Sequence, residues 1–316
     1  MHRLSRCSKA VLVALIASAC SVGEAELGQT LTVAAVGASN PTTAVDPETG
    51  TALVAWVGSE AGQSDVLLAR ISPDGAMSEP VRVNDIPGDG APHFQAPAQV
   101  AAGSDGQVYV LWTNNTLIEG RRFPSSDLRF ARSSDGGRTF EPTITVNDDA
   151  GGPPTSHTFH NLMVAPDGTL YATWLDSRGN TFASEAMPGE RVDGSERESA
   201  VEHDPDMGEA GGEHSGHRDP AMDSPDATGP DLRIAVSHDG GRSFLPSMIV
   251  DRNTCPCCRT AMAMGPDGEL YVGWRKVFEG NVRDVVLARS DDGGKTFGRP
   301  MRVHEDGGVF LGCPHA

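Results

Sequence analysis

The chain has 316 residues, a formal net charge of −18 and a hydrophobic content of 38%. That apolar fraction is enough for a packed core and too low for a protein with many membrane spans. The acidic balance argues against nucleic acid as a partner, because nucleic-acid phosphates are bound by Lys and Arg.

The first twenty residues have the features of an export signal. Three basic residues precede the ten-residue apolar run "AVLVALIASA", which is too short to span a bilayer. The stretch "ASAC" ends at Cys20, which resembles the lipidated cysteine of a bacterial lipobox. We therefore expect a signal peptide over 1–19, a linker over 20–30 and an outer-membrane lipoprotein that faces the periplasm or the cell surface. Ordinary cleavage nearby is the alternative.

A repeated strand pattern follows the linker. The four tryptophans, Trp56, Trp112, Trp174 and Trp274, each close a similar run, namely "TALVAW", "QVYVLW", "TLYATW" and "ELYVGW". Three of these runs follow an Asp-Gly turn, and all three tyrosines of the chain lie inside them. Alternating β-branched and aromatic residues after such turns predict strands that leave hairpins.

A second motif, S-x-D-x-G-x-[ST]-F, recurs after the tryptophans. It occurs as "SSDGGRTF", "SHDGGRSF" and "SDDGGKTF", with a degenerate first copy "SPDG". In the first and last copies the tryptophan lies 18 residues before the motif aspartate, which is Asp74 or Asp292. In the third copy the separation to Asp239 is 65, and removal of a 47-residue insertion over roughly 184–230 restores 18. A unit of about 50 residues with four strand-like runs predicts the blades of a β-propeller.

The repeated motif closely resembles the Asp box of the sialidase (BNR-repeat) superfamily, over most of residues 31–306. The resemblance implies an all-β, sialidase-like propeller over 31–316. We expect blades over 31–88, 89–150, 151–252 and 253–306, and the start of a fifth over 307–316. Family propellers have six blades, so four complete blades imply a truncated propeller. The Asp box is structural in this family, so Asp135, Asp239 and Asp292 are interpreted as turn residues and not as catalytic acids.

The insertion over 184–230 contains no Leu, Ile or aromatic residue, and its thirteen acidic residues face only three arginines. Such a segment cannot bury a core of its own. Its side chains include three histidines and two methionines that could collect a metal, His203, Met207, His214, His217 and Met222. The insertion is therefore either a solvated spacer or a weak metal-collecting arm.

The loops that connect one blade to the next carry most of the chemistry. Because consecutive strands reverse direction, these inter-blade loops share the face opposite the Asp boxes. They and the chain end supply His93, His157, His160, Cys255, Cys257, Cys258, Cys313 and His315. We expect the cysteines, His157, His160 and His315 to lie together at the mouth of the central channel, with His93 farther away.

Three interpretations of the cysteines stay open. In an exported protein, an even set of four cysteines favours disulfide staples, for instance Cys258 or Cys255 with Cys313. A set of thiolates and imidazoles would instead bind copper(I) or zinc, although C-x-C-C matches no standard zinc spacing. A catalytic thiol with a histidine partner is the third interpretation.

The family resemblance does not transfer an enzyme activity. Sialidases hold the substrate carboxylate with three arginines and use a Tyr–Glu pair and an Asp acid. The F/Y-R-I-P motif is missing from this sequence, and every tyrosine lies in a repeat strand. Arg178, Arg259, Arg275 and Asp176 are nevertheless expected on the channel face as candidates for binding a small molecule or a glycan. The two hypotheses are an exported propeller that binds a ligand or a soft metal ion, and a divergent exo-α-sialidase-type glycoside hydrolase.

Overall fold

The computed structural model describes residues 30–33, 37–93, 95–120, 124–179 and 229–305. Residues 33–316 belong to one structural unit, and the following description concerns that unit. The expected signal peptide, Cys20, Cys313 and His315 lie outside the described residues, as does nearly all of the insertion.

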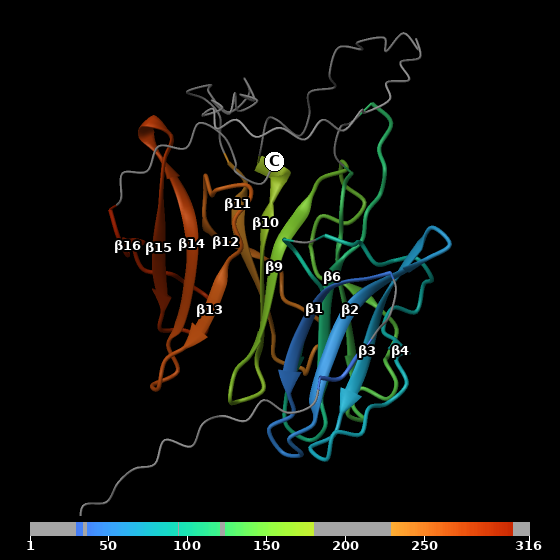
Figure 1. Cartoon of the computed structure of the whole chain (residues 1–316). Helices are drawn as coiled ribbons and strands as arrows, with labels where there is room; N and C mark the ends of the chain where they lie inside the picture. Colours follow the sequence, from blue (N-terminus) through green and yellow to red (C-terminus); the bar gives the residue numbers. More distant parts are fainter. Residues whose placement is uncertain (1–29, 34–36, 94, 121–123, 180–228, 306–316) are drawn as a thin grey trace, which may run out of the picture. The chain divides into compact units, whose positions relative to one another are not determined.

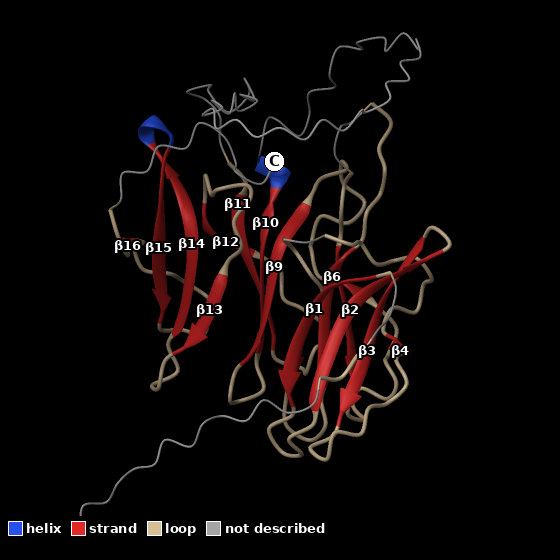
Figure 2. Cartoon of the chain, viewed as in Figure 1, coloured by secondary structure: helices blue, strands red, loops and turns tan. Residues whose placement is uncertain are grey.

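The described residues form four sheets of four antiparallel strands each (Figures 1 and 2). Blade 1 comprises β1 (Ala38–Val45), β2 (Ala52–Glu60), β3 (Gln63–Ile71) and β4 (Val81–Arg82). Blade 2 comprises β5 (Gln99–Ala102), β6 (Val108–Thr113), β7 (Leu128–Ser133) and β8 (Ile144–Thr145). Blade 3 comprises β9 (His157–Val164), β10 (Leu170–Asp176), β11 (Asp231–Ser237) and β12 (Met248–Asp251). Blade 4 comprises β13 (Ala261–Met264), β14 (Leu270–Phe278), β15 (Val282–Ser290) and β16 (Met301–Arg302).

Within each blade, the strands pair in chain order, and the first strands of successive blades are neighbours. β1 lies beside β5, β5 beside β9 and β9 beside β13. Two short 3₁₀ helices, η1 (Ser177–Gly179) and η4 (Glu279–Asn281), follow β10 and β14. No helix within the described ranges is long and apolar enough to cross a membrane. This arrangement confirms the predicted sialidase-like propeller fold with four complete four-stranded blades.

The Asp boxes are closed by hydrogen bonds within the motif, as their interpretation as turns requires. In blade 2, Ser133 Oγ donates to Asp135 Oδ1 at 2.7 Å and accepts from Gly137 N at 2.9 Å. Thr139 donates through both its backbone N and its hydroxyl to the Asp135 carboxylate. Blade 4 repeats these bonds around Asp292, whose pKa falls to about 2 because Thr296 and Ser290 donate to its carboxylate. These carboxylates hold turns together and are not aimed at a substrate.

The second glycine of each Asp box also sets the packing between blades. Gly137 has a φ of +76°, and a Cβ there would lie 3.0 Å from Leu68 of blade 1. Gly241 has a φ of +79°, and its Cβ would lie 2.7 Å from the Phe130 ring of blade 2. Only glycine fits this conformation and this close approach. The three hydrophobic clusters accordingly lie between blades 1 and 2, blades 2 and 3, and blades 3 and 4.

Candidate functional site

Three of the cysteines meet in the loop between β12 and β13. Cys258 N donates to Cys255 O at 3.4 Å, which closes a turn with Pro256 at its second position. Cys255 N donates to Arg275 O on β14 at 2.8 Å, and Thr254 N donates to Pro230 O at 3.0 Å. The turn is therefore fixed to two neighbouring segments of the sheet.

The three sulfur atoms of this turn form one cluster, which we name the thiol cluster (Cys255, Cys257 and Cys258). The Cys255 sulfur lies 3.5 Å from that of Cys257 and 3.3 Å from that of Cys258. All three sulfurs lie within 4.8 Å of one another. Cys255 is 1% exposed, whereas the other two cysteines are half-buried. Cys255 and Cys258 are free thiols, while Cys257 is disulfide-bonded.

Positive charge surrounds the thiol cluster. Arg283 on β15 is buried, and its guanidinium donates to Cys255 Sγ at 3.5 Å. The hydrogen bond from Cys258, together with the Arg283 charge, holds the pKa of Cys255 below its usual range against the effect of burial. The same shared hydrogen bond and burial raise the pKa of Cys258, although Arg275 opposes that shift. The opposite directions of the two shifts favour the thiolate on Cys255 and the proton on Cys258.

The thiol cluster fits a soft metal ion when Cys257 is reduced. Two thiolates bound to one ion by metal–sulfur bonds of about 2.3 Å lie about 3.8 Å apart in tetrahedral geometry. The sulfur separations of 3.3 and 3.5 Å are close to that value. The disulfide at Cys257 removes one of the three thiolates, so the oxidised cluster offers only two free sulfurs.

His157 lies in a different environment from the thiols, and the expectation that it joins them is wrong. Its Nδ1 is 2.5 Å from Ser126 O, and its Nε2 is 3.1 Å from Asp149 Oδ1 and 3.4 Å from Asp176 Oδ2. Burial disfavours the imidazolium, but the ion pairs with Asp149 and Asp176 outweigh it and raise the pKa of His157 to about 9. Both ring nitrogens face oxygen atoms. Among the described residues, the cluster with metal-ligand spacing contains the three cysteines alone.

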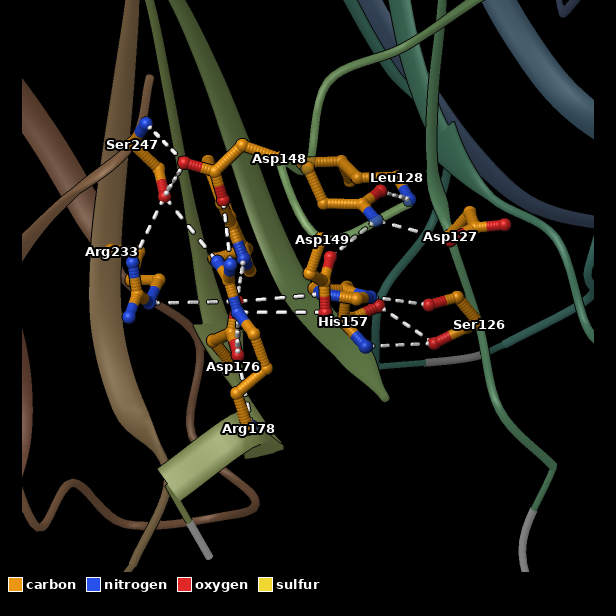
Figure 3. Close-up of polar contacts among 12 residues, drawn as sticks. Ser126, Asp127, Leu128, Asp148, Asp149, His157, Asp176, Arg178, Arg233 and Ser247 are labelled. Carbon is orange, nitrogen blue, oxygen red and sulfur yellow. Dashed lines mark hydrogen bonds and ion pairs between the residues drawn. The ribbon is translucent and has the colours of Figure 1, made fainter. Parts of the chain in front are cut away.

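Asp176 is the centre of the charged network around His157 (Figure 3). Its side chain is fully buried and accepts hydrogen bonds from Trp174 Nε1 at 2.9 Å and from Arg178 Nη2 at 2.8 Å. His157 and Arg178 hold the pKa of Asp176 well below its usual range, although burial alone would raise it. Arg178 also reaches Asp148 at 2.6 Å. The pair proposed for ligand binding, Asp176 and Arg178, is thus neutralised within the protein.

His160, His93 and Arg259 form a second group, which β9 and two inter-blade loops supply. His160 is 2% exposed, and its ring interacts with the backbone of Pro97 and Leu111 and not with a carboxylate. Burial, together with the charges of Arg259 and His93, lowers the pKa of His160 to about 4. The His93 ring packs edge-on against Phe159, with centroids 5.7 Å apart. His93, expected to be the outlier, therefore lies near His160.

The predicted arginines have separate roles. Arg259 donates from Nε to the Gln95 carbonyl, and Arg275 donates from Nε to Arg283 O at 3.2 Å. Arg275 also hydrogen-bonds to Cys258. Arg275 thus belongs to the surroundings of the thiols, Arg178 to the charged network and Arg259 to the histidine group. The three do not converge on one anion in the described residues.

The three tyrosines lie in the strands of the blades. Tyr109 and Tyr171 are buried in β6 and β10, and burial raises the pKa of both phenols. Tyr109 stacks on Phe130, and the Tyr171 ring packs against the Asp-box glycine Gly294 of the next blade. Tyr271 lies in β14. All three tyrosines therefore belong to the blades.

No family model matches the chain, and no curated protein matches it. Among solved structures, it is similar to a protein of unknown function from Dyadobacter fermentans, with 12% identity over 84% of this chain and 69% of that one, at a TM-score of 0.48. It is also similar to the intramolecular trans-sialidase from Ruminococcus gnavus, with 11% identity over 85% of this chain and 71% of that one, at a TM-score of 0.48. Likenesses at such identity concern the fold alone. The four-stranded blades, with an Asp-box turn between the third and fourth strands of blades 2, 3 and 4, make this fold sialidase-like and divergent.

Proposed function

We propose that this protein is an exported, sialidase-like propeller that binds one soft metal ion through Cys255, Cys257 and Cys258 when all three are reduced. The observation that carries this proposal is the set of three sulfurs within 4.8 Å of one another. The turn that holds them is fixed by backbone hydrogen bonds to β14 and to Pro230, so the sulfurs are brought together before any ion arrives.

Copper(I) suits this site better than zinc. Soft thiolates select copper(I), which accepts few ligands, whereas structural zinc requires four. The described cluster supplies three sulfurs and no imidazole. Three thiolates with one Cu⁺ would carry a net charge of −2, and the two arginines beside them, Arg275 and Arg283, offset that charge.

The test is a competition titration on the full-length chain, reduced and kept anaerobic. Copper(I) and zinc are each titrated against a chromophoric chelator. The expected result is one copper(I) ion per chain and an affinity that falls at low pH as the thiolates take up protons. Cys255→Ser should abolish this binding. Thr254→Ser is the matched control, since serine keeps the hydroxyl that donates to Pro230 O. Wild-type binding by both Cys255→Ser and Cys258→Ser would refute the proposal.

Export and membrane anchoring through a lipid on Cys20 complete the proposed function. Their support is the basic flank, the short apolar run and the cysteine that ends "ASAC". Cell fractionation of a Cys20→Ala variant tests them, and the protein is expected to leave the outer-membrane fraction. An unchanged membrane fraction would show that Cys20 does not anchor the chain.

A further inference from the structure

Every blade has an aspartate near the start of its third strand. The third strands contain "DVLLARI", "DLRFARS", "DLRIAVS" and "DVVLARS", which begin at Asp65, Asp127, Asp231 and Asp284. In three blades, a side chain from the segment after the fourth strand donates a hydrogen bond to this carboxylate. The donors are Asn84 to Asp65 at 2.7 Å, Asn147 to Asp127 at 3.0 Å and Arg252 to Asp231 at 3.2 Å. The repeated contact ties the third strand to the end of the fourth.

Blade 4 departs from this pattern at Asp284. Its side chain is 0% exposed, and neither of its carboxylate oxygens has a hydrogen-bond partner in the described part of the chain. Arg302 on β16 approaches it, with Nη1 3.4 Å from Oδ2. His304, which is exposed, occupies the position that corresponds to Asn84 of blade 1. A buried carboxylate without hydrogen bonds lowers stability, so its presence requires another explanation.

Asp284 lies behind the wall of an open pocket, which we name the blade-4 pocket. This pocket has a volume of about 480 Å³, and its lining residues are Phe278, Glu279, Val282, Arg302 and Glu305. It lies beside η4, the short helix that connects β14 to β15 (Figure 2). A pocket of this volume can hold a small molecule.

The blade-4 pocket carries an excess of negative charge. Glu279 and Glu305 are exposed lining residues, Asp284 lies behind them, and Arg302 supplies a positive charge. Three carboxylates and one guanidinium leave a formal charge of −2. This charge favours a cation as the ligand.

The aromatic wall of the blade-4 pocket already holds a cation. The guanidinium carbon of Arg302 lies 3.7 Å from the centroid of the Phe278 ring. The face of an aromatic ring attracts positive charge within about 6 Å of its centroid. Phe278 thus offers a ring face to a cation, and Val282 adds an aliphatic surface beside it.

We infer that the blade-4 pocket binds an aliphatic ammonium ion, a molecule with one or two amino groups on a short carbon chain. The ammonium group lies between Glu279 and Glu305, and the carbon chain lies against Phe278 and Val282. Arg302 is 3.8 Å from Glu305, so their ion pair is loose. A ligand that pairs with Glu305 releases Arg302 toward Asp284, and the buried carboxylate gains the hydrogen bond that its counterparts in the other blades have.

The blade-4 pocket is separate from the thiol cluster. Successive residues of a strand point to opposite faces of the sheet. Arg283, which contacts Cys255, therefore lies on the opposite face of β15 from Val282 and Asp284. The inference goes beyond the proposed function and requires no metal ion.

Calorimetric titration of the full-length chain tests the site, after treatment with a metal chelator and desalting. The probe is 1,4-diaminobutane. The expected result is one diamine per chain, with an affinity that falls as the salt concentration rises, because the two glutamates are exposed. The uncharged 1,4-butanediol has the same carbon chain and should not bind. Equal affinity for the diol, or no saturable binding of the diamine, would overturn the inference.

Paired variants separate the blade-4 pocket from the general negative charge of the chain. Glu279→Gln with Glu305→Gln should weaken diamine binding about tenfold, because both ion pairs to the ligand are lost. Phe278→Leu keeps an apolar wall and should weaken it at least about threefold, because the ring face is lost. The control is Glu60→Gln with Glu79→Gln, which removes two exposed charges from blade 1 and should leave the affinity unchanged. Wild-type affinity in the pocket pair, or an equal loss in the control pair, would show that the diamine does not bind in this pocket.

Discussion

The inter-blade loop and the strands beside it have different roles in blade 3 and in blade 4. Near the start of blade 3, His157, Asp149, Asp176 and Arg178 form a network in which each charge faces an opposite charge. Ahead of blade 4, Arg283 faces sulfur atoms whose charge depends on oxidation and on bound metal. A network in which every charge is paired stabilises the fold. A thiol cluster whose charge changes with oxidation or metal binding can instead perform chemistry.

The same contrast occurs inside β9, where two buried histidines lie three residues apart. His157 contacts two carboxylates and has a pKa raised to about 9. His160 faces no carboxylate, and burial lowers its pKa to about 4. Burial acts on both rings, so the two carboxylates beside His157 are the main cause of the opposite directions.

Removal of the central carboxylate should have the largest effect on stability. Asp176→Ala leaves His157 and Arg178 without their buried partner and should lower the free energy of unfolding by about 3–5 kcal/mol. Urea unfolding measures this loss. The control is Asp291→Asn, which removes an exposed ion pair with Arg289 and should cost less than about 1 kcal/mol. Equal losses in the two variants would show that the network does not hold blade 3.

The charge on His157 predicts a loss of stability at alkaline pH. Because its pKa rises from 6.5 in the unfolded chain to about 9, the folded state binds the extra proton between these values. The stabilisation is complete below pH 6.5 and disappears as the pH rises through 9, and it amounts to about 3 kcal/mol. Unfolding of wild type and of His157→Gln at pH 6.5 and 9.5 tests this. A variant with the same alkaline loss as wild type would contradict the assignment.

The neutral state of His160 predicts a loss on the acid side. Its pKa falls from 6.5 to about 4 on folding, so the unfolded chain binds more protons between these values. The contribution of neutral His160 to the free energy of unfolding is complete above pH 6.5. It declines as the pH falls through 4, by up to about 3 kcal/mol. His160→Leu removes the titrating group and should flatten this part of the pH profile. If His160→Leu loses as much stability at acid pH as wild type, other groups cause that loss.

The blades could be predicted from the sequence because their signals are local. An Asp box needs a Ser, an Asp and glycines with positive φ within a few residues, and its bonds close over two to four positions, as from Ser133 to Gly137. Strand alternation also placed the three cysteines in one inter-blade loop, where β12 and β13 enclose them.

The partners of His157 could not be predicted in the same way. Strand parity assigns His157 to a face of the sheet but does not say which neighbour its ring contacts. Ser126 is 31 residues away, and Asp149 belongs to the loop that precedes β9. The sequence did carry one partial signal for Asp149. The triplet "VND" at 83–85 and 146–148 follows the fourth strand of blades 1 and 2, and Asp149 comes directly after its second copy. Arg283 carried no local signal, because β14–β15 pairing brings it to Cys255, 28 residues away.

The smallest expected change in stability comes from Cys258→Ser, and it tests the comparison most directly. Serine can still donate a hydrogen bond to the Cys255 sulfur, and Cys258 is half-buried in a turn that backbone hydrogen bonds close. The free energy of unfolding should therefore change by less than about 1 kcal/mol, even though the cluster loses a sulfur. Urea unfolding under reducing conditions measures it beside Asp176→Ala. A loss as large as that of the Asp176 variant would mean that the thiols, like the network of blade 3, support the fold.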